Sequence, residues 1–322
     1  MNICFTLCSN NYLAQALVML TSFKEHHPGI KCIVGLVDQA DDSIDYLAFN
    51  IDILPVEELN IPDFDFLQVK YDIIELNTTV KPFYFKYFFE NYKSGKVIYL
   101  DPDIKIYSEF TEVLNLLDTY NIVITPQNCT PIDDGHLPSD KDLLGTGTFN
   151  LGFIALSNYN KVSDFLNWWQ KRLVKYGFAK TDQNMFFDQL WINLVPAFFD
   201  NYHILKHFGY NTAPSNLHER AISVSDTNCY IINETEPLRF YHFSGYKSSN
   251  PGLLCSYTER FNFENRQDVV KIYEDYRNDL SGFRIENFSK IKPKFGHVRK
   301  SDKKSFLVMF IKKIAYYIIN KL

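Results

Sequence analysis

The first 38 residues predict two strands joined by a helix, and this order constrains the fold more than any other feature of the chain. Residues 3–7 form a short β-prone run, residues 12–27 place apolar side chains at helical spacing, and residues 32–37 form a second apolar run. Pro28 and Gly29 end the helix. Strands joined in this way run parallel, because parallel neighbours need a crossover connection. We therefore expect an α/β domain whose mixed, mainly parallel sheet is flanked by helices.

The size and composition of the chain exclude several classes of protein. Its 322 residues, 46% of them hydrophobic and 22% charged, provide a full buried core and exclude intrinsic disorder. The sequence has no uncharged apolar run of about 18 residues, and residues 1–20 lack the basic start of a signal peptide. We therefore expect a cytoplasmic protein. The six cysteines form no C-x-x-C pair, which argues against a zinc site or a disulfide scaffold.

The end of the chain is basic, whereas the rest is acidic. Residues 289–322 contain ten Lys and Arg residues and a single acid, Asp302, although the net charge of the chain is −5. An acidic body has little attraction for nucleic acid, so we expect no nucleic-acid partner. The tail suits peripheral association with an anionic membrane, at the inner face of the cell membrane, or packing on the protein's own body. A domain boundary is predicted after Tyr246, which separates a domain of residues 1–246 from an extension of residues 247–322.

Two acids follow the apolar strand that is predicted at residues 96–100. In Asp101-Pro102-Asp103 the two carboxylates are two residues apart, and Pro102 holds Asp101 in an extended conformation. Ligands bind at the carboxyl edge of parallel α/β sheets, where these acids emerge. Two carboxylates at this edge suit Mg²⁺ or Mn²⁺ holding a diphosphate. A simple capping turn is the alternative, since Asp and Pro are common in turns.

Two further candidates are basic. His242 lies in an aromatic run that breaks at Gly245, where a neutral imidazole completes a metal site and the glycine lets the backbone approach a phosphate. The alternative is a hydrogen-bonded histidine in an aromatic core. Lys81 precedes Pro82 and an aromatic helix predicted over residues 84–92, and it is either a phosphate-binding cation or a surface lysine.

Two acid-amide pairs lie in a helix that is expected around residues 183–194. Asp182-Gln183 and Asp188-Gln189 are one and a half turns apart on such a helix, so only one pair would face a cleft. The polar segment of residues 126–148 is long enough for a lid, a binding loop or a disordered tether.

Taken in order, these motifs resemble the GT-A nucleotide-sugar glycosyltransferases, and among them the bacterial family 8-like retaining enzymes. Residues 99–104 resemble the Tyr-Leu-Asp-x-Asp metal motif of these enzymes, and residues 149–153 resemble their Asn-x-Gly-Phe strand. Residues 188–193 are similar to their Asp-Gln helix, and residues 242–245 to their late His-x-x-Gly. The resemblance covers roughly residues 2–250 and implies a GT-A, Rossmann-like fold.

The resemblance also implies roles for individual residues. Asp101, Asp103 and His242 would bind the divalent metal, Mn²⁺ or Mg²⁺, and Asp188 with Gln189 would lie beneath the anomeric carbon as the catalytic pair. The implied nucleotide-sugar-binding residues are Thr6, Asn10, Tyr12, Asp38, Lys81, Asp101, Pro102, Asp103, Asn150, Gly152, His242, Gly245 and Lys247. Two positions depart from the family pattern. Cys8 stands where relatives often place an acid near the base, and Lys247 follows Gly245 one residue early.

The function expected from this resemblance is metal-dependent, retaining transfer of a hexose or N-acetylhexosamine from a UDP-sugar. The acceptor would be a cell-surface glycan, a lipid-linked saccharide or a protein. Asp188 would stabilise the oxocarbenium-like transition state or act as a transient nucleophile. One alternative is a nucleotidyltransferase, which would carry a glycine-rich turn where this chain has Cys, Ser and two Asn at residues 8–11. The other is a non-catalytic nucleotide-sugar-binding protein of the same fold.

Overall fold

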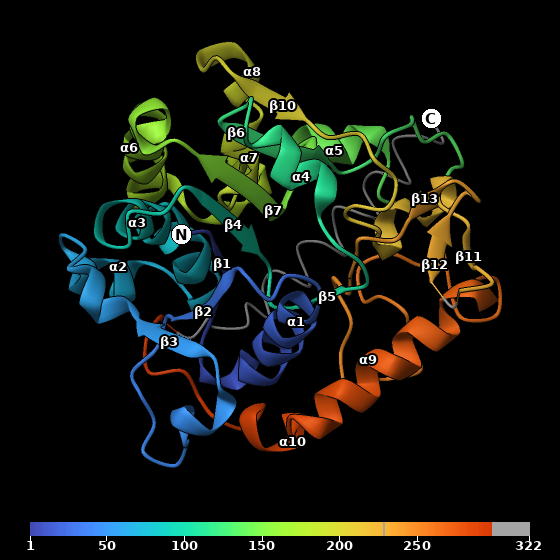
Figure 1. Ribbon diagram of the computed structural model, residues 1–322, viewed down its shortest axis with the longest axis horizontal. Helices are drawn as coiled ribbons and strands as arrows, with labels where there is room; N and C mark the ends of the chain where they lie inside the picture. Colours follow the sequence, from blue (N-terminus) through green and yellow to red (C-terminus); the bar gives the residue numbers. More distant parts are fainter. Residues whose placement is uncertain (228, 298–322) are drawn as a thin grey trace, which may run out of the picture.

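A seven-stranded sheet forms the centre of the molecule in the computed structural model, which describes residues 1–227 and 229–297 (Figure 1). In spatial order its strands are β10 (Tyr202–Ile204), β6 (Ile122–Pro126), β7 (Phe149–Ser157), β4 (Lys96–Leu100), β1 (Ile3–Cys8), β2 (Lys31–Leu36) and β3 (Asp52–Pro55). Strands β4, β1, β2 and β3 are parallel, β10 is parallel to β6, and β7 is antiparallel to both of its neighbours. The mixed, mainly parallel sheet that the sequence predicts is thus confirmed.

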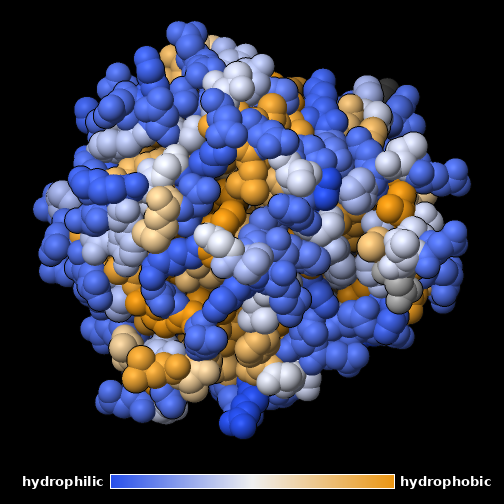
Figure 2. Space-filling view, viewed as in Figure 1, coloured by the Kyte–Doolittle hydropathy of each residue, from blue (hydrophilic) through white to orange (hydrophobic). Residues whose placement is uncertain are grey.

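Helices cover both faces of this sheet, as the fully buried strand β1 requires. Phe5 packs into the core beneath α3 and α6, whereas its neighbour Cys4 packs into the core beneath α1 and α4 (Figure 1). The helices on these two faces are α1 (Leu13–His26), α3 (Ile73–Asn91), α4 (Thr111–Leu116) and α6 (Tyr159–Tyr176). Hydrophilic residues cover most of the face seen in Figure 2, and hydrophobic residues show mainly in the hollows between them.

A short pair of antiparallel strands lies next to the carboxyl end of β4. The chain leaves β4, passes through Asp101, Pro102 and Asp103, and enters β5 (Ile104–Ile106). Strand β14 (Phe240–His242) pairs with β5 so that His242 is opposite Ile104. This register brings the end of β14 to the residue that directly follows Asp103.

The segment after Tyr246 packs against the first helix of the chain. Ala14 and Val18 of α1 share a hydrophobic core with Ile272 and Tyr273 of α9. The elements of this region are α9 (Val270–Gly282) and α10 (Ile285–Phe288), beside a small antiparallel sheet of β11 (Ile222–Val224), β12 (Tyr230–Ile232) and β13 (Glu236–Pro237). The predicted domain boundary after Tyr246 stays a prediction.

The basic tail lies mostly beyond the described part of the chain, which ends at residue 297, so its association with a membrane also stays a prediction. Within the described residues, no helix has both the length and the apolar character that crossing a membrane requires.

Two helices differ from the sequence prediction. The helix expected over residues 84–92 is only the second half of α3, which begins at Ile73 and contains Pro82. Asp72 and Glu75 form a capping box that fixes this earlier start. The single helix expected around residues 183–194 is instead a set of short elements. They are the strand pair β8 (Ala179–Lys180) and β9 (Met185–Phe186), followed by α7 (Gln189–Ile192) and α8 (Val195–Phe198).

The polar segment of residues 126–148 is held to the body of the protein. It ends in α5 (Asp140–Thr146), and a separate short helix, α2 (Phe64–Lys70), precedes α3. The nearly buried guanidinium of Arg260 forms an ion pair with Asp134 and donates to the carbonyl oxygens of His136 and Pro138. Glu219 accepts hydrogen bonds from the backbone N–H groups of residues 129 and 130. The segment is therefore an anchored loop rather than a tether.

Candidate functional site

Two acids and a histidine meet at the carboxyl edge of the sheet. Nε2 of His242 lies 3.2 Å from Oδ1 of Asp103 and 3.8 Å from Oδ2 of Asp101. One potential ligand atom from each residue lies within 4.8 Å of the other two. Two carboxylates and an imidazole at this spacing fit a divalent cation such as Mn²⁺ or Mg²⁺. The donor set that the sequence predicts is therefore assembled, whereas the identity of the ion stays a prediction.

Backbone hydrogen bonds fix the positions of these three residues. The N–H of Asp101 donates to the carbonyl oxygen of Gly152 on β7 (2.8 Å), and the N–H of Phe243 donates to that of Asp103 (2.8 Å). The phenol of Tyr99 donates to Oδ1 of Asp101 (2.6 Å) and orients the carboxylate. The donor set therefore rests on sheet backbone, which keeps its geometry rigid.

The charges of the cluster affect one another. Burial lowers the pKa of His242, but the carboxylates of Asp103 and Asp101 outweigh burial and raise this pKa above its usual value. Burial raises the pKa of the Asp101 carboxyl, although Lys81 and His242 oppose this shift. A bound cation would favour the ionised carboxylates and the neutral imidazole, because these are the forms that coordinate a metal.

Gly152 gives the His242 ring its place. A Cβ atom on Gly152 would lie 2.5 Å from Cε1 of His242 and 2.8 Å from Oδ1 of Asn150, which no real contact allows. Asn150 accepts from the N–H of Gly152 (2.8 Å) and donates to Oε1 of Gln127 (2.9 Å). Gly152 therefore lies against the His242 ring, and the Asn150 side chain holds the backbone of Gly152 in this position.

Lys81 and Asp188 form a buried ion pair. Nζ of Lys81 lies 2.5 Å from Oδ2 of Asp188, and the two side chains are only 1% and 3% exposed. The same ammonium donates to the carbonyl oxygen of Leu151 (3.0 Å) and lies 4.1 Å from the centre of the Tyr99 ring. Lys81 is therefore not a surface lysine, and it connects Asp188 to the ring that holds Asp101.

Asp188 and its neighbour Gln189 have different surroundings. Burial raises the pKa of the Asp188 carboxyl, and the ion pair with Lys81 opposes this rise. The amide of Gln189 is used by the backbone, since its Oε1 accepts from the N–H of Leu151 (3.2 Å) and its Nε2 donates to the carbonyl oxygen of Thr146 (2.7 Å). In this arrangement Gln189 ties α5 to β7, and Asp188 is the better candidate for a reacting group.

A cavity of about 290 Å³ opens beside the two acids. Of the predicted binding residues, Tyr12, Asp101, Pro102 and Asp103 line it. The start of α3 also lines it, with Ile73, Ile74, Asn77 and Thr78. Its position next to the donor set suits the nucleoside part of a ligand whose phosphates reach the cation.

Three other predicted residues are buried and do not line this cavity. Thr6 is fully buried in β1, and Asn10 is almost fully buried. Asp38 is fully buried too, and its Oδ2 accepts from both the backbone N–H (3.2 Å) and the side-chain amide (3.0 Å) of Asn10. These contacts support the cavity wall from inside the protein.

Gly245 and Lys247 follow β14 on the other side of the cluster. Gly245 has a φ of +76°, and a Cβ atom there would lie 2.7 Å from Sγ of Cys255. The glycine therefore permits a close approach to the segment of residues 255–257. Lys247 is exposed, and its binding of a phosphate stays a prediction.

The sequence reasoning missed two contributors to the site. Tyr99 belongs to the metal motif that the sequence shows, but the hydrogen bond by which its hydroxyl orients Asp101 is visible only in the structure. The start of α3 is the second, because a helix predicted to begin after Pro82 leaves out Ile73 and the turns that follow it. The spacing of Asp72 and Glu75, three residues apart, was the signal that could have revealed it.

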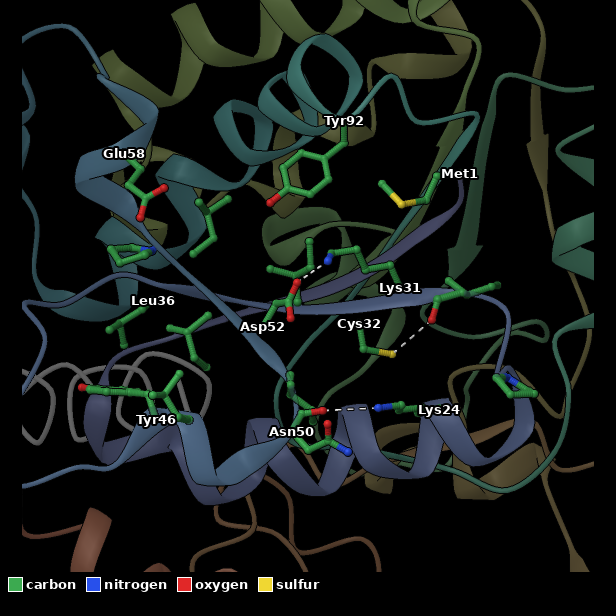
Figure 3. Close-up of a pocket in the computed structure, with 18 of the residues that line it drawn as sticks. Met1, Lys24, Lys31, Cys32, Leu36, Tyr46, Asn50, Asp52, Glu58 and Tyr92 are labelled. Carbon is green, nitrogen blue, oxygen red and sulfur yellow. Dashed lines mark hydrogen bonds and ion pairs between the residues drawn. The ribbon is translucent and has the colours of Figure 1, made fainter.

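A second cavity, of about 880 Å³, lies at the opposite edge of the sheet, where β2 and β3 begin (Figure 3). Lys31 and Asp52 form an ion pair there, and Lys24 donates to the carbonyl oxygen of Asn50 (3.3 Å). Lys31, Asp52 and Lys24 are thus engaged with one another or with the backbone. We therefore place the functional site at the Asp101 edge.

Comparison with known proteins gives sequence relatives and structural neighbours at low identity. No family model matches the chain. Two proteins of Bacillus subtilis (strain 168) are similar to it. The uncharacterized protein YfnD is 23% identical over 278 residues, covering 84% of this chain and 86% of that protein. The uncharacterized protein YfnF is 23% identical over 310 residues, covering 93% of this chain and 98% of that protein.

The solved structures similar to the chain include three glycosyltransferases. The galactosyltransferase LgtC, solved with donor and acceptor sugar analogs, is 17% identical with a TM-score of 0.49, covering 88% of this chain and 96% of that one. The glycosyltransferase GlyE of Streptococcus pneumoniae TIGR4 is 14% identical with a TM-score of 0.48, covering 90% of this chain and 65% of that one. Mouse xyloside xylosyltransferase 1 is 15% identical with a TM-score of 0.42, covering 75% and 97%.

Proposed function

We propose that the protein is a metal-dependent, retaining glycosyltransferase. It moves a hexose or N-acetylhexosamine from a UDP-sugar to a cell-surface glycan, a lipid-linked saccharide or a protein. The observation that carries this proposal is the cluster of Asp101, Asp103 and His242 beside a cavity at the carboxyl edge of the sheet. A nucleoside diphosphate would occupy both features, because its phosphates bind the cation and its nucleoside fits the cavity.

Each side chain has a role in the proposed reaction. Asp101, Asp103 and His242 hold Mn²⁺ or Mg²⁺, which, when bound, offsets the negative charge of the departing diphosphate. The bond between the anomeric carbon and the diphosphate oxygen breaks, and its electron pair leaves with the diphosphate. Asp188 faces the positive charge that develops on the sugar, as a stabiliser or as a transient nucleophile. The acceptor hydroxyl gives its proton to the departing diphosphate as its oxygen bonds to the anomeric carbon, on the face from which the diphosphate left.

Lys81 keeps Asp188 ionised and oriented in this scheme. Its ammonium contacts the Asp188 carboxylate, the Leu151 carbonyl oxygen and the Tyr99 ring, and these three contacts fix its position. A positive charge in this place also favours the incoming diphosphate.

Thermal unfolding tests the proposal. The protein is heated with UDP, GDP, CDP or no nucleotide, each with and without Mn²⁺. A ligand at about 100 times its dissociation constant adds about 2.7 kcal/mol. We expect a rise of several degrees in Tm only with UDP and Mn²⁺ together. A selective rise with another nucleotide would replace the donor, and no rise with any nucleotide would contradict the proposal.

Turnover separates transfer from the alternative functions. UDP-sugars are incubated with the protein and Mn²⁺, and release of UDP is followed together with the anomer of any product. Binding of UDP without release from any sugar donor would favour a non-catalytic binding protein. Release of pyrophosphate from UTP and a sugar phosphate would favour a nucleotidyltransferase.

We also propose that the basic tail brings the enzyme to the inner face of the cell membrane. Ten Lys and Arg residues among residues 289–322 support this proposal, together with the apolar residues between them. Co-sedimentation with vesicles of phosphatidylglycerol, but not of phosphatidylcholine, is the expected result. Equal binding to both kinds of vesicle, or to neither, would contradict it.

A further inference from the structure

The last described residues cross the edge of the sheet close to the cavity beside Asp101. We call residues 294–297 the C-terminal strap. In Figure 1 the red segment that follows α10 runs past β3 toward α2. The N–H of Lys294 donates to Oδ1 of Asp38 (2.7 Å), and the N–H of His297 donates to the carbonyl oxygen of Tyr71 (2.9 Å). The strap therefore touches two segments that are far apart in the sequence.

The first of these contacts leads to one wall of the cavity. Asp38 is fully buried, and its other carboxylate oxygen accepts two hydrogen bonds from Asn10. Asn10 begins the short helical turn Asn10–Tyr12, whose residues Asn11 and Tyr12 line the cavity. Asp38 thus connects the strap to this wall through three hydrogen bonds.

The other contacts lead to the part of the cavity wall that α3 forms. Gly296 has a φ of +81°, and a Cβ atom there would lie 2.6 Å from the backbone N of Ile73 and 2.9 Å from the carbonyl carbon of Asp72. Ile73 lines the cavity. Phe295 is 5% exposed and packs edge-on against Phe64, with ring centres 5.5 Å apart. Backbone therefore meets backbone at the start of α3, where only glycine fits.

We propose that the C-terminal strap is a positioning element for the donor nucleotide, because it ties together the two walls of the cavity that receives it. This inference rests on the proposed function. Among the described residues, the contacts of the strap go to Asp38, Phe64, Tyr71 and the start of α3, and none of these residues belongs to the metal cluster. The strap therefore sets nucleotide affinity and leaves metal affinity unchanged. A role of this kind belongs to residues that lie outside the motifs shared with glycosyltransferases, which end near residue 250.

A matched pair of glycine variants tests the inference in the full chain. Gly296→Ala places a methyl group against the backbone of α3, whereas the Cβ of Gly282→Ala, at the end of α9, meets nothing within 4 Å. The affinity for UDP is measured by calorimetry at saturating Mn²⁺, and the affinity for Mn²⁺ alone by electron paramagnetic resonance. The KM and kcat for release of UDP from the accepted UDP-sugar complete the set.

We expect Gly296→Ala to weaken UDP binding about tenfold, a change of about 1.4 kcal/mol. Its KM should rise by a similar factor, while kcat and the Mn²⁺ affinity match those of Gly282→Ala. A role in folding alone would lower both affinities together, or neither, and either result would overturn the inference. If Gly296→Ala does not fold, Phe295→Leu keeps an apolar side chain at the neighbouring position and should show a smaller rise in KM alone. Absence of nucleotide binding by the unmodified protein would reject the proposed function itself, and the strap's role with it.

Discussion

The ammonium of Lys81 and the carboxylate of Asp188 lie 2.5 Å apart, and both side chains are almost completely buried. Lys81 comes from the middle of α3, and Asp188 directly precedes α7, so the pair joins two helices that are distant in the sequence. Burying two charges is costly, and their attraction offsets this cost only while both are present. The pair therefore stabilises the site as a unit, and each partner depends on the other.

Replacing one partner should cost more stability than replacing both. Lys81→Met leaves the Asp188 carboxylate buried without a counter-charge, and we expect a loss of about 3–5 kcal/mol in the free energy of unfolding. The double variant Lys81→Met/Asp188→Leu removes both charges and should recover most of this loss. Urea unfolding measures both values. The double variant should nevertheless release no UDP from a UDP-sugar, because the proposed reacting carboxylate is gone.

An exposed pair is the control for this experiment. Lys271 and Asp275 form an ion pair on the surface of α9, and the Lys271 side chain is 66% exposed. Lys271→Met should change the urea midpoint little, since water and salt screen exposed pairs. A double variant at Lys81 and Asp188 that is as unstable as the single variant would show that the sites are not coupled.

Asp103→Asn should remove the metal-dependent step and leave the fold intact. Asp103 is partly exposed, and an amide in its place is a poor ligand for a hard cation. We expect the UDP and Mn²⁺ stabilisation to disappear and the activity to fall by at least about 100-fold, since losing even a supporting residue costs 10–100-fold. Asp65→Asn, at an exposed acid of α2, should behave as the unmodified protein. Full activity in Asp103→Asn would contradict the assignment of the metal site.

Gly152→Ala should weaken the metal site through His242. The added methyl group would lie 2.5 Å from Cε1 of the imidazole, so the ring must leave its present position beside Asp103. We expect the Mn²⁺ affinity to drop by about 10–100-fold, as for other changes that disturb a metal ligand's orientation. Electron paramagnetic resonance of Mn²⁺ measures this, with Gly282→Ala as the matched control. An unchanged affinity would mean that the ring does not bind the ion.

Metal binding should weaken as the pH falls. The carboxylates around His242 raise its pKa above the usual value of about 6.5, and burial raises the pKa of Asp101. Raised pKa values mean that protons occupy the ligand atoms up to a higher pH, and a protonated imidazole cannot coordinate. The Mn²⁺ affinity of the protein should therefore fall as the pH drops, and the fall should begin at a higher pH than for an ordinary histidine ligand. His242→Asn should lose much of this dependence, and an affinity that increases toward acid would contradict the ligand set.

The main elements of the fold could be predicted because their patterns are local. Strand β1, helix α1 and strand β2 each show their own apolar spacing, and the crossover between the strands makes them parallel. The start of α3 could not be predicted from apolar spacing alone. Pro82 suggested a boundary, but the buried face of the helix continues across it and the capping box at Asp72 stabilises the earlier start.

The metal cluster was partly visible in the sequence. Asp101 and Asp103 share a turn after an apolar strand, so their proximity follows from their spacing. That His242 joins them depends on the pairing of β14 with β5, which places it opposite Ile104. The resemblance to a family motif indicated His242 as a metal ligand. The contact of His242 with Asp103 arises from the register in which β14 pairs with β5.

Local sequence patterns were enough to predict the α/β order of elements, the pair of acids at a strand end and the basic character of the tail. The pairing of Lys81 with Asp188, the backbone contacts of Gln189 and the contact of Lys294 with Asp38 are seen only in the folded chain. The physical reason is that local spacing fixes which residues share a turn or a face of one element. Contacts between distant segments depend on how the helices and strands pack around a common core, and no local pattern records that packing.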